Sequence, residues 1–275
     1  MPDHARITVI CALPSEAAPL VEHWQLRLTR AQPFQLWQHA QRQVLVSGVG
    51  SHACAAAVGY AAAVAPTASI EVWCNAGIAG HRQLALGSAI VAERVTQHGR
   101  DDSWYPCMTA APPCRTAALV TYDQPVIDYP ADGCVDMEAA GFMAAVARVS
   151  NSDLVGVFKV ISDNAKHAFA GLERARVQAL IGAHLALFDT VIDGLLAHAH
   201  NVPAFAPEQD AALAHWHFTR MQARQLRQIA QRRNWLTPTL AWPHAALARC
   251  QSAAEVLARL RAELPAPPPH GPAPA

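Results

Sequence analysis

Lysine is nearly absent from this chain of 275 residues, which contains only Lys159 and Lys166. Arginine supplies the other positive charges, and the 21 basic residues balance 21 acidic ones at a formal net charge of zero. A balanced chain has no overall field to attract nucleic acid or an anionic membrane as its main partner. Since 52% of the residues are hydrophobic and 15% are charged, the chain can bury a large core and fold without disulfide bonds or metal ions to stabilise it.

Paired cysteines and long hydrophobic runs are also lacking. The seven cysteines are odd in number and include no C-x-x-C pair, so we expect reduced thiols in the core or at the surface. No apolar run reaches the roughly 18 residues of a membrane-spanning helix. The first residues show no charged segment followed by an apolar one, as a signal peptide would. We therefore expect a cytoplasmic protein.

Short apolar runs alternate with segments of helical spacing along most of the chain. Runs with strand character occupy residues 7–13, 35–39, 43–47, 70–74, 89–96, 117–121 and 154–161. Helical spacing is found in residues 17–24, 51–65, 137–147 and 172–198. Such alternation is typical of α/β proteins. We predict a three-layer α/β sandwich around a mixed, partly parallel sheet.

A change in composition near residues 201–207 predicts a linker and a domain boundary. Residues 1–200 then form one domain, 201–264 a small helical C-terminal appendage, and 265–275 a disordered proline- and alanine-rich tail. Two capping-box patterns, Thr219 with Gln222 and Ser252 with Glu255, mark helix starts in the appendage.

The helix predicted to open at His215 carries several arginines on one side. Such a face could contact a nucleic-acid backbone, but we favour a solvated face on a packing appendage and expect no nucleic-acid partner. The arginines are Arg220, Arg224, Arg227, Arg232 and Arg233. His215 and His217 have no partners at zinc spacing, so we expect no metal and no cofactor.

Three acids stand next to predicted strand ends. Asp163 ends the apolar run 154–161, Glu138 lies where a strand-like stretch meets a helical one, and Glu16 follows the first run. Side chains at the carboxyl ends of parallel strands face a common cleft. Each acid also has a purely structural interpretation, as a helix N-cap for Asp163 and as a first-turn acid for Glu138 and Glu16.

Together the three carboxyls suit cleavage of an N-glycosidic bond. That reaction needs a proton donor for the departing base, a group that binds the ribose hydroxyls and a nucleophile below the anomeric carbon. Burial at a strand end favours the protonated form of a carboxyl such as Asp163 and prepares it to act as an acid. The residues therefore indicate an enzyme that handles nucleosides.

Five short motifs follow the order found in a known family. They are Ala12-Leu13-Pro14-Ser15-Glu16, Ser47-Gly48-Val49-Gly50, Asn75 to Gly80, Val135-Asp136-Met137-Glu138 and Ile161-Ser162-Asp163. Through them the chain resembles the 5′-methylthioadenosine/S-adenosylhomocysteine nucleosidases of the purine and uridine phosphorylase superfamily. The match covers about residues 7–199, so residues 1–200 would be the nucleosidase/phosphorylase-like domain.

The resemblance implies a role for each acid and a set of substrate contacts. Asp163 would protonate the leaving adenine, Glu138 would bind the ribose hydroxyls, and Glu16 would deprotonate the attacking water. The remaining positions implied to bind substrate are Met137, Val49, Gly77, Ile78, Ala79, Pro125, Val126 and Ser162. The family completes its pocket across a subunit interface, which implies a homodimer. The substrates implied are methylthioadenosine, adenosylhomocysteine or 5′-deoxyadenosine, with no cofactor.

The sequence departs from the family at three points. Ile78 stands where the family has a serine, and Pro125 stands where it has the aromatic residue that stacks on the base. The link between this segment and Met137-Glu138 is also shorter than usual. A futalosine or deoxyadenosine hydrolase and a noncatalytic nucleoside-binding or regulatory module therefore stay open.

A purine nucleoside phosphorylase is the other alternative. Arg42, Arg82 and Arg94 could serve a phosphate site, but the phosphorylase-type Gly-Asp-Pro-x-Arg loop is absent. Glu16 would also repel phosphate, so water is the favoured nucleophile.

Overall fold

The computed structural model describes residues 5–65, 70–108, 112–126, 128–167, 173–201, 207–237 and 239–264. The chain divides into two compact units, Met1–Asn201 and Val202–Ala275. The tail 265–275, predicted to be disordered, and most of the predicted linker lie outside the described residues.

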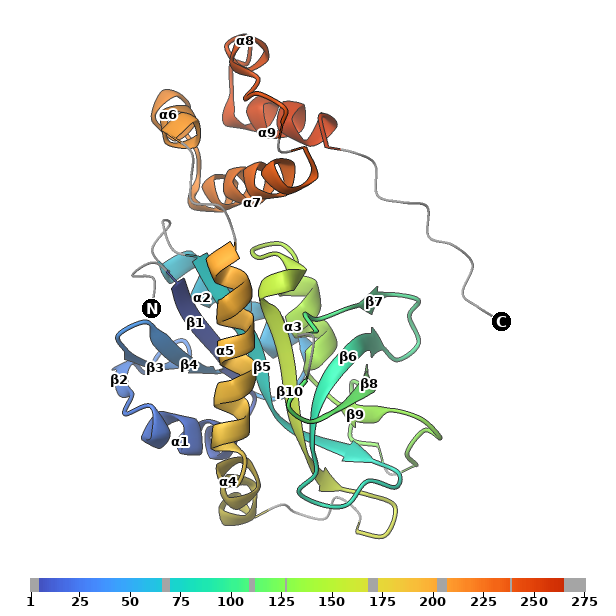
Figure 1. Ribbon diagram of the computed structural model, residues 1–275. Coiled ribbons are helices and arrows are strands. Elements are labelled where there is room, and N and C mark those ends of the chain that lie inside the picture. Colours follow the sequence, from blue (N-terminus) through green and yellow to red (C-terminus); the bar gives the residue numbers. More distant parts are fainter. Residues whose placement is uncertain are drawn as a thin grey trace. The chain divides into compact units, whose positions relative to one another are not determined.

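The first unit is built on one mixed sheet of ten strands (Figure 1). Its centre is parallel: β5 (Ile70–His81) lies between β1 (Ala5–Cys11) and β10 (Val155–Asp163), and β4 (Arg42–Val46) follows β1 in the same direction. The edge beyond β4 consists of β3 (Gln35–His39) and β2 (Arg27–Arg30), both paired antiparallel. Parallel strands buried on both faces explain the nearly continuous apolar runs of β1 and β10.

The other half of the sheet curls back on itself. β6 (Ala89–Gln97) pairs antiparallel with β10 and parallel with β8 (Arg115–Thr121), and β9 (Cys134–Asp136) joins β8 to β5. The short β7 (Ser103–Trp104) pairs with β6. The circuit β5, β10, β6, β8, β9 and back to β5 is closed, so this part resembles a small barrel attached to an open sheet.

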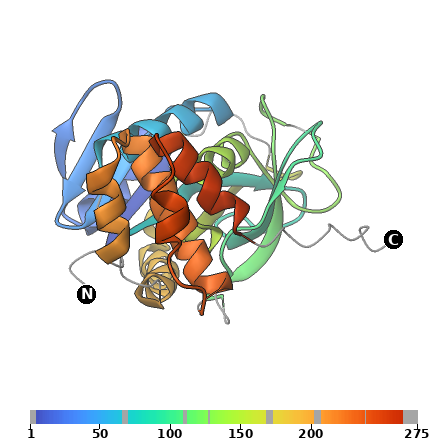
Figure 2. The same ribbon diagram turned by 90° about the horizontal axis from the view of Figure 1, so that it is seen from above.

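Helices cover both faces of the sheet, as the view from above shows (Figure 2). α2 (Ser51–Val64) and α3 (Ala139–Val146) pack together over the main hydrophobic core. The opposite face carries α1 (Pro14–His23), α4 (Arg174–Gly182) and α5 (Leu185–Asn201). A one-turn 3₁₀ helix, Ser152–Leu154, precedes β10. The three layers confirm the predicted α/β sandwich around a mixed sheet.

Two predicted elements differ from the structure. The single helix expected over residues 172–198 is broken into α4 and α5, which are bent by 57°. The break follows Gly182, and His184 Nε2 there bonds the Gly87 carbonyl oxygen at 2.6 Å. The strand expected to end at Cys74 continues to His81, because β10 and β9 both pair with its small-residue segment. That segment is therefore strand rather than a glycine-rich loop.

Three strands, β2, β7 and β9, were not predicted. β2 is exposed at all four positions and so lacks the apolar alternation that marks a strand. β9 has only three residues, too few for a period to be visible. Within the described chain no single helix is long and apolar enough to cross a membrane, and only the bent pair α4 and α5 passes that test by length and composition.

The second unit is helical, as predicted, with α6 (Pro207–His215), α7 (Arg220–Leu236), α8 (His244–Leu247) and α9 (Ala253–Ala262). Thr219 and Ser252 cap α7 and α9, at the two predicted helix starts. The prediction that a helix opens at His215 was wrong, since His215 ends α6. The buried core of the unit comprises Ala212, Leu226, Ile229, Leu247, Val256, Leu257 and Leu260.

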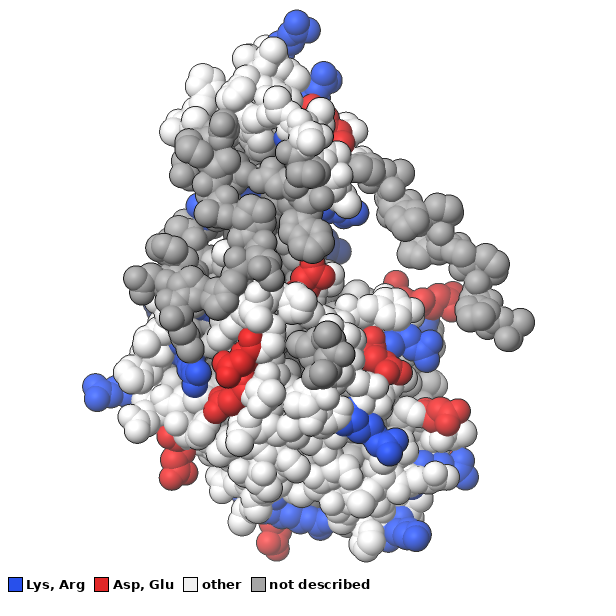
Figure 3. Space-filling view, viewed as in Figure 1, with Lys and Arg blue, Asp and Glu red and all other residues white. Residues whose placement is uncertain are grey.

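Arg233 does not lie on a solvated arginine face. It is 2% exposed, its Nε bonds Glu263 at 3.3 Å, and its other nitrogens donate to the carbonyl oxygens of Leu240 and Ala241. One of the five arginines of the predicted basic face therefore holds this unit together. On the side of the molecule visible in Figure 3, basic and acidic side chains lie scattered among uncharged ones.

Candidate functional site

The three predicted acids line one cavity of about 110 Å³ at the carboxyl ends of β1, β5 and β10. Ten of the eleven predicted site residues line it, and Gly77 lies directly behind Glu16. The lining residues are Ala12, Leu13, Glu16, Val49, Ile78, Ala79, Gly80, Gln124, Pro125, Val126, Val135, Asp136, Met137, Glu138, Ser162 and Asp163. Segments far apart in the sequence thus form a single site.

Glu16 lies at the start of α1, and backbone groups hold its carboxylate. Oε2 accepts hydrogen bonds from the N–H groups of Ala12 and Leu13 at 2.9 and 2.8 Å, and Oε1 accepts one from Ile78 at 2.9 Å. Burial raises the pKa of Glu16, while Lys159 and these backbone bonds lower it. The side chain accepts from the N–H groups just before α1 and also reaches across to Ile78 of β5, so the first-turn interpretation describes only part of its contacts.

Gly77 makes the approach of Glu16 to β5 possible. A Cβ at position 77 would stand 2.5 Å from Glu16 Oε1, closer than any real contact. The absence of a side chain is therefore a steric requirement for the position of this carboxylate.

Glu138 points across the cavity mouth instead of capping its own helix. It occupies the N-cap position of α3 without a capping bond, and its Oε1 accepts the Gly50 N–H at 2.8 Å. Burial raises the pKa of Glu138 to about 7, although Lys159 acts in the opposite direction. A carboxyl that titrates near neutral pH inside a cavity is a common mark of a functional site.

Asp136 takes over the capping of α3. Its Oδ2 accepts the Ala139 N–H at 2.9 Å, its Oδ1 accepts the Thr121 hydroxyl at 2.6 Å, and that hydroxyl oxygen accepts the Ala140 N–H. The N–H groups at the start of α3 are thus satisfied without Glu138. The first-turn interpretation of Glu138 does not describe its contacts.

Lys159 is a buried cation that the sequence analysis did not assign to the site. Its Nζ lies 2.8 Å from Asp136 Oδ2, and the two side chains are 2% and 1% exposed. Burial lowers the pKa of Lys159, but Asp136, Glu138 and Glu16 raise it, with a net upward shift. One positive charge therefore stands among three acids. A lysine inside an apolar strand of a chain with two lysines was the signal that could have revealed it.

Asp163 is the last residue of β10 and is 6% exposed. Its Oδ1 accepts the hydroxyl of Ser162, and its Oδ2 accepts the hydroxyl of Tyr129. The helix N-cap interpretation was wrong: Asn164 forms a tight turn with His167, and the next described helix begins at Arg174. Tyr129 was missed because it lies in an irregular segment without a motif.

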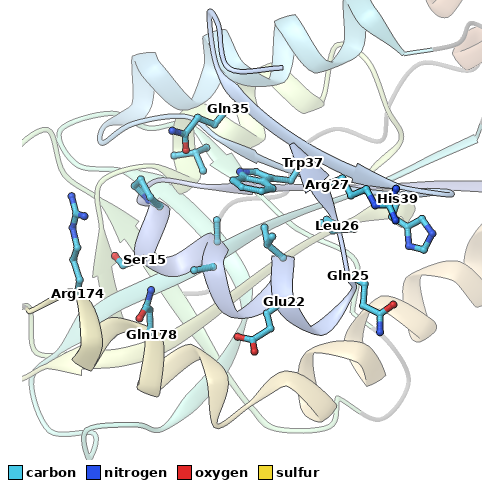
Figure 4. A pocket seen from close by; sticks show the side chains of 15 residues that line it. Ser15, Glu22, Gln25, Leu26, Arg27, Gln35, Trp37, His39, Arg174 and Gln178 are labelled. Carbon is cyan, nitrogen blue, oxygen red and sulfur yellow. The ribbon is translucent and has the colours of Figure 1, made fainter. Parts of the chain in front are cut away.

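A larger cavity of about 650 Å³ lies elsewhere on the unit, between α1, α4 and the strands β2 and β3 (Figure 4). Trp37 lies near its middle, with Arg27 and His39 to one side and Arg174 to the other. Glu22 is the one acid among its described lining residues. The smaller cavity holds the acids, so we assign the site by chemistry rather than by volume.

Within the described residues, no group of three histidine, cysteine, aspartate or glutamate side chains is placed to hold a metal ion. Arg42, one of the candidate phosphate ligands, lies 4.8 Å from the Trp24 ring centroid and 3.9 Å from Asp189. The three candidate arginines, Arg42, Arg82 and Arg94, do not line the acid cavity.

Solved structures of nucleosidases share this fold, with a sheet covered by helices on both faces. Methylthioadenosine/S-adenosylhomocysteine nucleosidases are among the structures that match. The Helicobacter pylori enzyme with butyl-thio-DADMe-Immucillin-A is 14% identical with a TM-score of 0.57, covering 69% of this chain and 98% of that one. The Colwellia psychrerythraea enzyme in complex with adenine is 18% identical with a TM-score of 0.56, covering 70% and 96%.

A futalosine hydrolase mutant from Helicobacter pylori matches similarly, with 14% identity, a TM-score of 0.54 and coverage of 69% and 99%. No protein-family model matches the chain, and no curated protein matches its sequence. At this identity the likeness shows a common fold. It confirms the predicted fold and its resemblance to these nucleosidases over about 70% of the chain.

Proposed function

We propose that this protein is a nucleosidase that hydrolyses the N-glycosidic bond of an adenine nucleoside modified at its 5′ position and releases adenine. The observation that carries this proposal is the meeting of Glu16, Glu138 and Asp163 in one cavity at the carboxyl ends of parallel strands. Methylthioadenosine, adenosylhomocysteine and 5′-deoxyadenosine are the candidate substrates.

Each carboxyl has an environment suited to one part of the reaction. Glu138, when ionised, accepts hydrogen bonds from the two ribose hydroxyls, and Met137 packs against the sugar. Glu16 takes a proton from the attacking water, and Asp163 donates one to the purine as the bond to the sugar breaks. Lys159, close to Asp136, limits the electrostatic repulsion between the acids that the cavity brings together.

Water is the proposed nucleophile because the described lining of the cavity includes four acids and no arginine or lysine. Phosphate would meet this set of carboxylates without a cation to bind it. Adenine is the proposed base because one matching nucleosidase is a complex with adenine.

A homodimer, implied by the resemblance, stays a proposal. Val49 lines the cavity and is nevertheless 51% exposed, as a residue would be if a second subunit closed the mouth.

The test measures the free base released with and without phosphate, which is adenine from methylthioadenosine, adenosylhomocysteine and 5′-deoxyadenosine, and hypoxanthine from futalosine. The wild type should release adenine without phosphate from at least one of the first three. Asp163→Asn should lower kcat by roughly 10²- to 10⁴-fold, the usual value of general acid help. Asp193→Asn, at an exposed position on α5, is the matched control and should keep full activity.

Three results would contradict the proposal. Release that depends on phosphate would make the protein a phosphorylase. Binding of nucleosides without any release would make it a noncatalytic module. A fully active Asp163→Asn variant would remove Asp163 from the role of acid.

A further inference from the structure

Tyr129 lies between β8 and β9 and touches the proposed acid directly. The residue is 4% exposed, and its hydroxyl donates to Oδ2 of Asp163. Gly80 of β5 provides the room for this contact, since a Cβ there would stand 2.5 Å from the Tyr129 ring and 2.6 Å from Asp163 Oδ2. The segment that carries Tyr129, the end of β5 and the end of β10 therefore pack closely around this hydrogen bond.

Both oxygens of Asp163 accept a hydroxyl proton in this arrangement. Ser162 donates to Oδ1 and Tyr129 donates to Oδ2. Burial and the bond to Asp163 raise the pKa of the Tyr129 phenol, so the phenol remains a donor throughout the neutral range. Hydrogen bonds donated to a carboxylate stabilise its ionised form over its protonated form.

A purine that takes a proton from Asp163 must approach one of the two oxygens that these hydroxyls contact. The Tyr129 hydroxyl lies at Oδ2, so a purine that binds to Oδ2 approaches the atom that the phenol already contacts. The contact is therefore in competition with the purine for the same atom.

We propose that Tyr129 is a positioning residue that orients the Asp163 carboxyl through its hydrogen bond to Oδ2 until a purine takes the place of the phenol hydroxyl there. This inference rests on the proposed function. When the phenol releases Oδ2, Asp163 takes a proton from solvent. As the bond from C1′ to N9 breaks, its electron pair goes to the purine and the Asp163 proton goes to N7. Water bonds to C1′ and gives its proton to Glu16, and Tyr129 then binds the regenerated carboxylate.

Other ionisable groups lie around this pair. The described lining of the cavity contributes Glu16, Asp136 and Glu138, with Lys159 behind them. His81 follows Gly80 on β5, and burial and Arg115 lower its pKa, whereas Asp132 raises it. The substitution Tyr129→Phe leaves all of these groups in place, so a change in titration between the two proteins reports on the phenol hydroxyl.

The experiment compares wild type, Tyr129→Phe and Tyr60→Phe. Tyr60 packs against Phe34 at a ring-centroid distance of 5.5 Å, away from the cavity, and serves as the matched control. The first measurement is kcat/KM for adenine release against pH. Loss of one hydrogen bond to a charged group should move the alkaline limb of Tyr129→Phe upward by about one pH unit. Tyr60→Phe should keep the wild-type limb.

A second measurement does not depend on activity. Proteins labelled with ¹³C at aspartate carboxyls are titrated by NMR, with the Asp163 signal assigned by its absence in Asp163→Asn. The midpoint of this signal should move upward by about one pH unit in Tyr129→Phe. An unmoved midpoint in a folded Tyr129→Phe protein would overturn the proposal, as would an unmoved alkaline limb. If the midpoint moves but the wild type cleaves no nucleoside, the role of the hydrogen bond is supported and the nucleosidase function is refuted.

Discussion

The carboxyl groups of Glu16, Glu138 and Asp163 accept hydrogen bonds from different kinds of donor. Backbone N–H groups hold both oxygens of Glu16, a single N–H holds Glu138, and hydroxyls hold Asp163. Among the described residues, the hydrogen bond that Glu138 accepts goes to Oε1, so its other oxygen could accept a ribose hydroxyl. Three acids of similar chemistry therefore have three different environments, as the three proposed roles require.

The pH dependence of stability tests the environment of Glu138. Burial raises its pKa to about 7, above the value of about 4.3 for an unfolded glutamate. Between these values the folded protein binds more protons than the unfolded chain, so the free energy of unfolding should fall as pH rises from about 4 to about 7. Glu138→Gln cannot ionise and should lack this part of the decrease.

Urea denaturation of both proteins at several pH values in this window provides the measurement. Glu93→Gln, which alters an exposed residue of β6, should keep the wild-type dependence. Parallel curves for wild type and Glu138→Gln would show that Glu138 titrates as it does in the unfolded chain.

At the scale of elements, three glycines allow the close approaches that position the site. β5 passes behind Glu16 at Gly77 and beside Tyr129 at Gly80, and α3 meets the start of α2 at Gly141. A Cβ at Gly141 would stand 2.1 Å from the Ser51 carbonyl oxygen. Because Glu138 and the Gly50 N–H flank this helix contact, the contact fixes the geometry of the proposed ribose site.

Gly141→Ala should destabilise the protein by about 1–3 kcal/mol, the usual cost of overpacking, or more because backbone must move. The matched control is Gly59→Ala in α2, where an added Cβ meets nothing within 4 Å. That change should stabilise by about 0.5–1 kcal/mol, since alanine favours a helix interior over glycine. Denaturant unfolding of both variants provides the comparison, and equal effects would contradict the packing described for α2 and α3.

At the scale of the molecule, all proposed site residues come from the first unit, between Ala12 and Asp163. The second unit has a hydrophobic core of its own. A chain truncated after Asn201 should therefore fold and release adenine with kcat/KM within about twofold of the full chain, by analogy with units that fold independently. Steady-state kinetics and circular dichroism measure this. A folded but inactive truncated chain would place a necessary part of the site in the second unit.

The sequence by itself determined the α/β class, most strands of the sheet and the set of acids. Apolar periodicity and motif order are local properties of the chain, so they can be detected without coordinates. Motif order also placed Glu16, Glu138 and Asp163 in one predicted cleft, where the structure indeed brings them together. Local patterns did not predict strands that are short, such as β9, or exposed, such as β2.

Only the tertiary structure decided the partners of these acids. Lys159 meets Asp136 from another strand, and Tyr129 reaches Asp163 across 34 positions of sequence. The extension of β5 to His81 depends on the neighbours β9 and β10, which no local pattern of β5 specifies. Long-range pairing and burial set the charge, orientation and hydrogen bonds of each carboxyl, and these depend on contacts that the order of residues alone does not display.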